Sequence, residues 1–524
     1  MSQLLKVFIS LLLFHPVSKS QTIEFLDIND VKASVSADGR LFRNGFEVPK
    51  GSKRNTINES NLWMAAYNGN RDLKVAANTF RNQSDFFYGP IATDYSDSSY
   101  INKYNRTWKI NQSDITNHIR NYMTPGYQTP NSIKDWPGNG NEANGEAKLL
   151  APFEDLNRNK IYEPEKGEYP IVCGDQAIYF IFNDSKSIHT NSNGEPLYFE
   201  IHGTVYGFKN SLDTALNQTV FVKFIIYNRS KSYYEDFCLG LLTDYKIGNS
   251  SDDYIGYDTG NQLAYSYNSS DTDLVYGVNP PVQGCLIFDS PVHTFMYYNS
   301  NNGNFPPATG TPSSAVEYYR FLNASWRDAT HLTRGGSGYN PSSQDSSKYA
   351  FTGNPFDTGW TQLGLSPKNI EHSLLAKKDD FLEANGITSA DFAFTYARDF
   401  KGNHLSAIKL LKEYASKVNW FYNDNLRSCA HPWVKTNQLD ATAQLYIEPN
   451  PFTSKIKIRS TNFPSNQKVK IEVFNYLGQT MWSEQKAQLD ENEIDLSILP
   501  PGIYFISFSY LNSRISKVIY KTQN

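Results

Sequence analysis

Short runs of apolar residues separated by polar turn residues recur along much of this 524-residue chain and are typical of β-strands. Aromatic and β-branched residues fill the clearest strand-like runs, at 177–183, 219–227 and 286–298. A helical period occurs at 406–421, where four apolar residues share one face: Ile408, Leu411, Ala415 and Val418. The pattern predicts an all-β fold with a large multi-sheet, β-sandwich-like main region, closed by one helix.

The strand pattern becomes shorter near the C-terminus. Polar and apolar residues alternate there at 455–458, 469–474, 503–508 and 515–520. About seven short strands in this segment are typical of a small Ig-like antiparallel β-sandwich. The proline-containing polar stretch 430–444 is the predicted linker before it. We therefore expect a main region at 21–429, formed by one domain or two subdomains, and the small sandwich at 445–524.

The first twenty residues are typical of an export signal. Lys6 supplies a positive charge, 7–14 are apolar except for Ser10, and Ser18 and Ser20 are small residues suited to a signal peptidase. The alternative is a buried N-terminal strand. We predict a signal peptide at 1–20, because the chain becomes polar and ordinary in composition after Gln21.

Composition narrows the classes of partner. The chain is 14% aromatic and 19% charged, with a formal net charge of −4. Without a basic patch, nucleic acid is not an expected partner. Past the N-terminus no apolar run approaches the roughly 20 residues of a membrane helix, so no transmembrane segment is expected in the mature chain.

Four cysteines complete the composition: Cys173, Cys238, Cys285 and Cys429. No two of them are spaced as Cys-x-x-Cys, which gives no support for zinc or thioredoxin-like chemistry. After export they could form up to two disulfides, and the sequence does not choose among the three connectivities. Buried free thiols are the alternative.

Four motifs occur in order within the small C-terminal sandwich. They are Pro449–Phe452, Phe474–Gln479, Asp495–Tyr504 and Lys517–Lys521. Together they resemble the type A C-terminal sorting domain of Bacteroidetes cargo of the type IX secretion system, over 445–524. The resemblance implies recognition by the outer-membrane translocon and removal by its sorting peptidase. It further implies passage through the periplasm, followed by release or attachment to anionic lipopolysaccharide at the cell surface.

The main region resembles a group of large secreted Bacteroidetes proteins of unassigned activity. Segments 26–31, 47–51, 62–77, 151–170 and 252–258 carry this likeness. It brings no catalytic residues with it.

Two acidic loops carry the most informative chemistry. In the first, oxygen-bearing side chains alternate before a group of glutamates: Asp155, Asn157, Asn159, the backbone of Ile161, Glu163, Glu165 and Glu168. Such spacing directs hard oxygen ligands to one point and suits Ca²⁺. An EF-hand loop has Gly at the sixth position and Glu at the twelfth, where this chain has Lys160 and Lys166. The alternative is a hydrogen-bonded Asx turn.

The second acidic loop contains Asp244, Asp252, Asp253 and Asp258, around Gly248 and Gly256. Carboxylates so close repel one another unless a cation bridges them, so calcium is the predicted cofactor here too. Solvated turn carboxylates are the alternative. We expect both loops to have a structural role, since extracellular calcium commonly holds long loops in place.

A search for catalytic motifs finds no His-Glu-x-x-His, Gly-x-Ser-x-Gly or phosphate-binding loop. The scattered His189, His202, His331 and His372 are expected to be ordinary polar residues. The glycine-rich 334–339 suits a glycan-binding or surface turn. Five tryptophans would stack on sugars if exposed, although core packing is their ordinary role: Trp63, Trp108, Trp136, Trp326 and Trp360.

The sequence thus favours a non-enzymatic binding or adhesion protein with calcium-held loops and glycan partners. The alternative is a secreted hydrolase of polysaccharide or protein, for which Glu195 and Glu200 are a candidate carboxylate pair.

Overall fold

The computed structural model describes residues 23–79, 84–186, 188–209, 213–299, 305–357, 359–365, 371–426, 444–461, 469–475, 480–486, 493–510 and 513–523. Contacts divide the chain into two compact units, 1–430 and 431–524. The predicted signal peptide and residues 430–443 of the predicted linker lie outside the described residues. Among the described residues, no helix is both long and apolar enough to cross a membrane.

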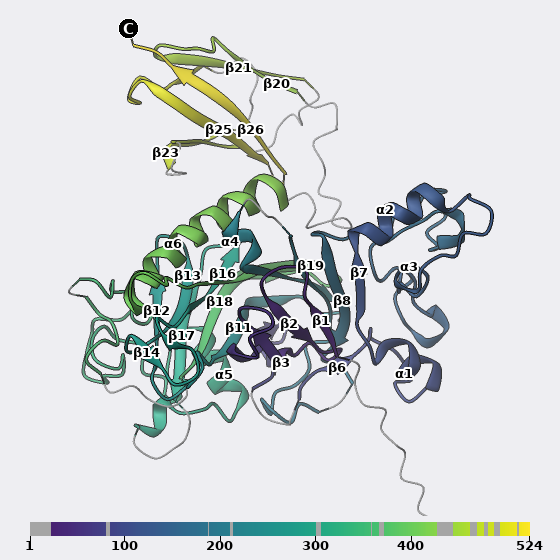
Figure 1. Ribbon diagram of the computed structural model, residues 1–524, viewed down its shortest axis with the longest axis horizontal. Coiled ribbons are helices and arrows are strands. Elements are labelled where there is room, and N and C mark those ends of the chain that lie inside the picture. Colours follow the sequence, from purple (N-terminus) through teal and green to yellow (C-terminus); the bar gives the residue numbers. More distant parts are fainter. Residues whose placement is uncertain are drawn as a thin grey trace, which may run out of the picture. The chain divides into compact units, whose positions relative to one another are not determined.

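The first unit is built on two antiparallel sheets (Figure 1). Sheet A has the order β1 (Glu24–Leu26), β2 (Lys32–Val35), β3 (Leu41–Glu47), β4 (Asn55–Asn68), β11 (Tyr234–Tyr245), β18 (Glu371–Leu382) and β17 (Thr294–Asn299), with β5 (Leu73–Ala77) paired to β4. Sheet B has the order β12 (Asp253–Asp258), β13 (Leu263–Asn268), β16 (Val282–Phe288), β19 (Ile387–Ala397), β10 (Thr219–Asn228), β9 (Phe199–Gly207), β8 (Gln176–Asn183) and β6 (Phe87–Tyr88), with β7 (Trp108–Asn111) paired to β8. The all-β prediction is confirmed.

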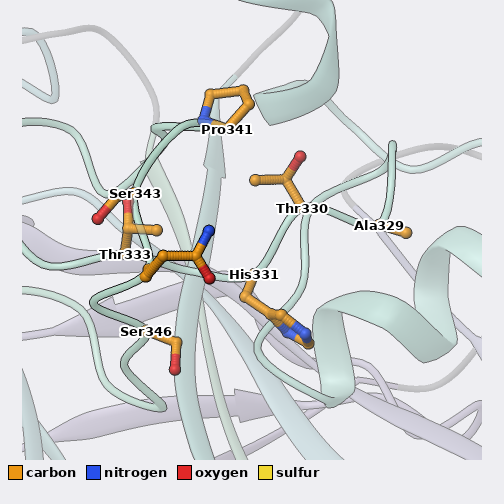
Figure 2. A pocket seen from close by; sticks show the side chains of 8 residues that line it. Ala329, Thr330, His331, Thr333, Pro341, Ser343 and Ser346 are labelled. Carbon is orange, nitrogen blue, oxygen red and sulfur yellow. The ribbon is translucent and has the colours of Figure 1, made fainter.

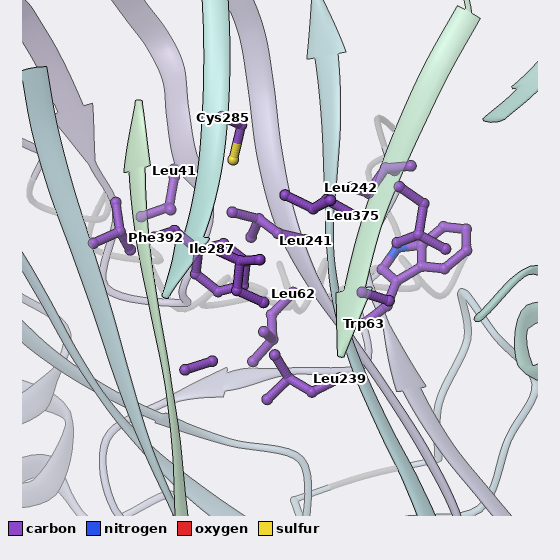
Figure 3. Close-up of a cluster of buried hydrophobic side chains, with 14 of the residues drawn as sticks. Leu41, Leu62, Trp63, Leu239, Leu241, Leu242, Cys285, Ile287, Leu375 and Phe392 are labelled. Carbon is purple, nitrogen blue, oxygen red and sulfur yellow. The ribbon is translucent and has the colours of Figure 1, made fainter. Parts of the chain in front are cut away.

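The core of this unit lies between the two sheets. Leu41, Leu62 and Leu241 of sheet A meet Ile287 and Phe392 of sheet B in one cluster of fully buried side chains (Figure 3). Each of these strands alternates its side chains between the core and the opposite face. Because that opposite face is also apolar in many strands, further elements cover both sheets.

Helices cover the outer faces of the sheets. Helix α5 (Ala315–Leu322) packs on β4, β5, β11, β17 and β18 of sheet A, and α6 (His404–Phe421) packs on β13, β16 and β19 of sheet B. The predicted helix is thus confirmed, and its four predicted apolar residues are buried. Asn403 begins α6 in a capping box with Ser406, which satisfies two otherwise free backbone N–H groups.

An insertion at 84–175, which we call the side lobe, covers another part of sheet B. It contains α1 (Ser98–Tyr104), β7, α2 (Gln112–Asn121), α3 (Asn131–Lys134), η1 (Glu142–Asn144) and η2 (Pro164–Lys166). Trp136 packs on Tyr179 of β8 with ring centroids 5.0 Å apart, and Trp108 lies 6.1 Å from the same ring. The first acidic loop belongs to this lobe.

The remaining short elements of the first unit lie in connections. They are α4 (Thr214–Asn217), β14 (Thr272–Asp273), β15 (Gly277–Val278), η3 (Pro307–Thr309) and the π-helix η4 (Tyr422–Leu426).

The apolar run 286–298 forms parts of two strands rather than one. It divides between β16 of sheet B and β17 of sheet A. Asp289 adopts a left-handed backbone conformation with φ of 60°, and Pro291 follows it. Proline lacks the N–H that a sheet ladder requires, so the chain leaves one sheet here and enters the other.

The second unit is the small antiparallel sandwich predicted for the C-terminus. One sheet has the order β20 (Gln444–Glu448), β21 (Lys455–Thr461) and β24 (Glu493–Asp495), and the other β23 (Thr480–Lys486), β22 (Val469–Phe474), β25 (Gly502–Tyr510) and β26 (Ser513–Lys521). Its own core includes Ile456, Val473 and Phe508.

Candidate functional site

The first acidic loop is a tight turn held by its own side chains. The Asp155 carboxylate accepts hydrogen bonds from the N–H groups of Asn159 (3.1 Å) and Lys160 (2.8 Å). The Asn157 Oδ1 atom accepts from the Asn159 N–H at 3.0 Å, and Asn159 Oδ1 accepts from the Ile161 N–H at 2.8 Å. The alternating oxygens therefore gather on the inside of one turn.

Lys160 adopts the backbone conformation that an EF-hand loop reserves for glycine. Its φ is 62°, in the left-handed region, and Arg158 has φ of 61°. A non-glycine residue pays roughly 1–2 kcal/mol for this conformation, and the hydrogen bond from the Lys160 N–H to Asp155 helps to hold it. Lys160, at the sixth position, therefore does not prevent the sharp turn for which an EF-hand loop uses glycine.

Glu168 is a buried acid in this loop. Gly167, with φ of 93°, turns the chain after η2, and the Glu168 side chain that follows has no exposed surface. Its Oε2 accepts from the Glu163 N–H at 2.7 Å, whereas its Oε1 has no hydrogen-bond partner among the described residues. Burial, with repulsion from Asp155 and Glu163, raises the pKa of Glu168, against the opposing effect of the Glu163 and Leu156 backbone N–H groups. A buried carboxylate with an unpaired oxygen calls for a cation or a proton.

The other two glutamates of the loop have partners of their own. Glu163 lies 2.6 Å from the Lys166 ammonium and accepts from the side-chain amides of Asn157 (2.9 Å) and Asn159 (2.7 Å). These contacts, the one to Lys166 first, lower its pKa to about 2. Glu165 is exposed and accepts from the Thr129 hydroxyl at 3.2 Å. The oxygens left for a cation belong to Asp155, Asn157, Asn159, Glu168 and the Ile161 carbonyl.

The second acidic set is divided by the fold. Asp252 and Asp253 stand at the start of β12, and Asp258 ends the same strand, where it lies 3.4 Å from Lys412. Asp244, on β11, accepts from the Asn58 amide at 3.1 Å. The strand thus separates Asp258 from the other aspartates.

Asp273 joins Asp252 and Asp253 in place of Asp258. The hairpin β12–β13 returns the chain so that buried Asp273 accepts from the Asn249 N–H at 3.0 Å. One buried oxygen of Asp252 and one of Asp253 have no hydrogen-bond partner among the described groups. Burial, reinforced by the repulsion between these carboxylates, raises the pKa of Asp253 and of Asp252. Sequence analysis did not select Asp273. The signal that could have found it is the β12–β13 hairpin, two strand-like runs joined by a short turn, which brings the segment after β13 near Asp253.

Within the described ranges, no three side chains of His, Cys, Asp or Glu are placed together as metal ligands. The first loop supplies two carboxylates that accept only backbone N–H groups among the described residues, Asp155 and Glu168, and its other oxygens come from amides and a carbonyl. That donor set fits Ca²⁺, which takes six to eight oxygens including amide, carbonyl and water, and it lacks the nitrogen and sulfur ligands of zinc.

Glu59, on β4 and opposite Asp244 in sheet A, is 1% exposed. Burial raises its pKa to about 7, against the opposing effects of its contacts with Asn61 and Arg43. Its contribution to stability is therefore fully present below about pH 4.5 and is lost as the pH rises through about 7.

The variant Glu59→Gln tests this charge effect. Glutamine stays neutral at every pH. The free energy of unfolding of the wild type is therefore expected to fall by about 3 kcal/mol relative to that of the variant between about pH 4.5 and 7. Urea unfolding at several pH values measures the difference. The exposed Glu142→Gln should keep the wild-type slope, and an unchanged slope in Glu59→Gln would contradict the assignment.

Histidines and tryptophans are mostly structural. Buried His202 contacts Tyr179 (2.8 Å) and Glu200 (3.1 Å), and Glu200 also binds Arg229. Glu195 instead pairs with Lys74 on the surface, so the two glutamates of the candidate carboxylate pair lie in different environments.

His189 and His372 are buried, as are four of the five tryptophans: Trp63, Trp108, Trp136 and Trp326. His331 and Trp360 are accessible.

The structure shows the bonding state of three of the four cysteines. Cys173 is disulfide-bonded, while Cys238 and Cys285 are buried free thiols. Burial raises the pKa of Cys238 to about 12, so it is unreactive at neutral pH. Cys429 lies outside the described residues.

A surface cavity of about 300 Å³ opens in the segment that follows α5. Figure 2 shows Ala329, Thr330 and His331 on one side, with Thr333, Ser343 and Ser346 across from them. Pro341 and Gln344 complete the lining. Apart from the His331 imidazole, the lining side chains carry no ionisable group.

Comparison with known proteins identifies the C-terminal unit. Residues 446–521 match the family described as the secretion system C-terminal sorting domain. No curated protein matches the chain. Among solved structures, the polysaccharide lyase BACCELL_00875 is similar at 10% identity and a TM-score of 0.19, over 62% of this chain and 34% of that one. The crystal structure of HI1317 is similar at 9% identity and a TM-score of 0.23, over 71% of this chain and 91% of that one. The chain thus spans about a third of the lyase.

Proposed function

We propose that this chain, a Bacteroidetes cargo of the type IX secretion system with a C-terminal sorting domain, is a non-enzymatic adhesion protein whose first acidic loop binds Ca²⁺. The sorting domain directs it through the periplasm to the outer surface or the medium. Removal of the tail by the sorting peptidase in the linker, followed by release or by attachment to anionic lipopolysaccharide, is part of the proposal.

The observation that carries the proposal is the Glu168 carboxylate. It is fully buried, one oxygen lacks a hydrogen-bond partner within the described chain, and its pKa is raised by its surroundings. A cation bound by Asp155, Asn157, Asn159, the Ile161 carbonyl and Glu168 would neutralise this charge. With no substrate access to Glu168, such a cation would be structural.

The position of the loop explains what the cation would stabilise. The Asn139 side chain accepts from the Tyr162 N–H at 2.6 Å and donates to the Lys160 carbonyl at 3.0 Å. The Tyr162 hydroxyl donates to the Ile133 carbonyl at 2.8 Å. The loop is therefore tied to the rest of the side lobe, and a cation would stiffen the lobe against sheet B. Asp252, Asp253 and Asp273 are the weaker candidate for a second ion, since β12 places Asp258 at its other end and Asp244 is bound to the Asn58 amide.

Calcium is expected to stabilise the full chain. When free Ca²⁺ exceeds Kd about a hundredfold, the expected gain is about 2.7 kcal/mol, measured by thermal or urea unfolding in Ca²⁺ and in EDTA. Glu168→Gln should lose most of this gain because it removes a buried ligand charge, whereas Glu165→Gln should keep it. Equal stability in Ca²⁺ and EDTA, or a Glu165→Gln defect as large as that of Glu168→Gln, would contradict the proposed ligands.

A further inference from the structure

The cavity after α5 has a rigid wall made by two short segments. Residues 329–333 and 341–346 are joined by a bridge between Thr333 and Ser346, and the N–H of Arg334 donates to the Asp345 carbonyl at 3.0 Å. On the other side, Ser325 forms a bridge with His331. The wall is therefore preformed, and ligand binding does not include the entropic cost of ordering it.

Two tryptophans fix the glycine-rich turn between these segments. The indole N–H of Trp326 donates to the Gly338 carbonyl at 3.0 Å, and that of Trp360 donates to the Gly336 carbonyl at 2.9 Å. Gly338 has φ of 78°, and a Cβ there would lie 2.7 Å from Leu332. A side chain would be strained at this position, so glycine allows the turn that joins the two lining segments.

The lining offers neutral hydrogen-bonding groups. The Gln344 amide and the Ser346 hydroxyl make no hydrogen bond with the described protein groups, and so remain available. His331 uses Nδ1 toward the Ser325 hydroxyl at 3.2 Å, which leaves Nε2. Hydroxyls and amides both donate and accept, as sugar hydroxyls do.

The cavity lining carries no permanently charged group. The eight lining residues include no carboxylate, ammonium or guanidinium group. The neighbouring Arg334 and Asp345 lie 3.4 Å apart and neutralise each other. Uronic acids, sulfated glycans and nucleotides would therefore find no counter-charge in the cavity. Ala329 and Pro341 supply apolar surface for the C–H face of a ring.

From these features we propose that the cavity binds a neutral saccharide, such as the terminal hexose of a glycan. This inference rests on the proposed adhesion function and names its ligand class and binding site. The volume of about 300 Å³ lies at the lower end of small-ligand pockets, which suits one or two sugar rings.

Binding of the full chain to an array of neutral and anionic oligosaccharides tests the inference, with calorimetry on the best neutral binder. Gln344→Ala removes an unpaired amide and should weaken that binding about tenfold. Ser346→Phe fills the cavity and should abolish it. The exposed Gln128→Ala, on the side lobe, is the matched control and should bind as the wild type does. All variants are compared by circular dichroism and melting temperature.

The outcomes separate this inference from the broader proposal. Neutral-glycan binding that survives both cavity variants, or binding of anionic glycans alone, would overturn the cavity assignment and leave adhesion standing. Binding to an immobilised protein but to no glycan would likewise overturn it. A wild-type chain that binds no glycan and no matrix protein would overturn both.

Discussion

Replacement of Asp85 by alanine is expected to lower the free energy of unfolding by about 3–5 kcal/mol. The buried Asp85 carboxylate accepts from the N–H groups of Ala77 (3.0 Å), Asn191 (2.8 Å) and Ser192 (3.2 Å). Its removal would leave these buried donors unpaired. The loop that carries Asn191 and Ser192 would then keep its direct bonds to Ala77 and Val75 of β5 but lose those made through Asp85.

His189 makes the loss larger. Its Nδ1 lies 2.6 Å from the Val75 carbonyl and its Nε2 lies 2.7 Å from the Asp184 carbonyl. The buried ring also lies 3.9 Å from the carboxylates of Asp85 and Asp184. Without Asp85, the ring loses one of its two neighbouring carboxylates.

Urea unfolding measures this effect. Asp94→Ala is the matched control, since Asp94 is exposed and accepts from the N–H and hydroxyl of nearby Ser96. A change within about 0.5 kcal/mol is expected there. If Asp85→Ala unfolded at the same denaturant concentration as Asp94→Ala, the buried ionic cluster would not be a source of stability.

Lys223→Met is expected to cost a similar amount, about 3–5 kcal/mol. Lys223 and Asp391 face each other on β10 and β19, with the ammonium 3.2 Å from the carboxylate and both side chains buried. Burial lowers the pKa of Lys223, against the effect of Asp391. Methionine would leave the aspartate buried without its partner.

The double variant Lys223→Met with Asp391→Leu distinguishes a lost ion pair from poor packing. Replacing both charges by apolar groups of similar size should restore most of the stability, because no uncompensated charge remains. Lys409→Met, at an exposed position of α6, is the control and should change little. A double variant as unstable as Lys223→Met would show that packing, rather than charge, sets the cost.

Periodicity predicted those parts of the fold in which one face of an element is buried. On β25, Ile503 and Phe505 are exposed while Tyr504 and Ile506 are buried, as the alternation predicts. The helical face of 406–421 is predictable for the same reason. The run 286–298 was not resolved into two strands, because strands buried on both faces show no alternation at their boundary.

Which acidic residues form the candidate cation site depends on which side chains are buried, and residue spacing in the sequence does not show this. Glu163, Glu165 and Glu168 are equally plausible ligands in the sequence, yet only Glu168 is turned inward, by Gly167. Asp258 is near Asp253 in sequence, but a strand of six residues places the two ends about 17 Å apart. Asp273 lies near Asp253, because the β12–β13 hairpin reverses the chain and brings the segment after β13 back to the start of β12.

Incubation of the full chain with polysaccharides and matrix proteins, in Ca²⁺ and after chelation, tests most directly whether this is a non-enzymatic binding protein stabilised by calcium. Retained polymer and newly released chain ends are measured together. The proposal predicts retention in Ca²⁺, weaker retention in EDTA, and no release of ends. Turnover of any polymer that is abolished by changing a single carboxylate or histidine would contradict it and establish a secreted hydrolase.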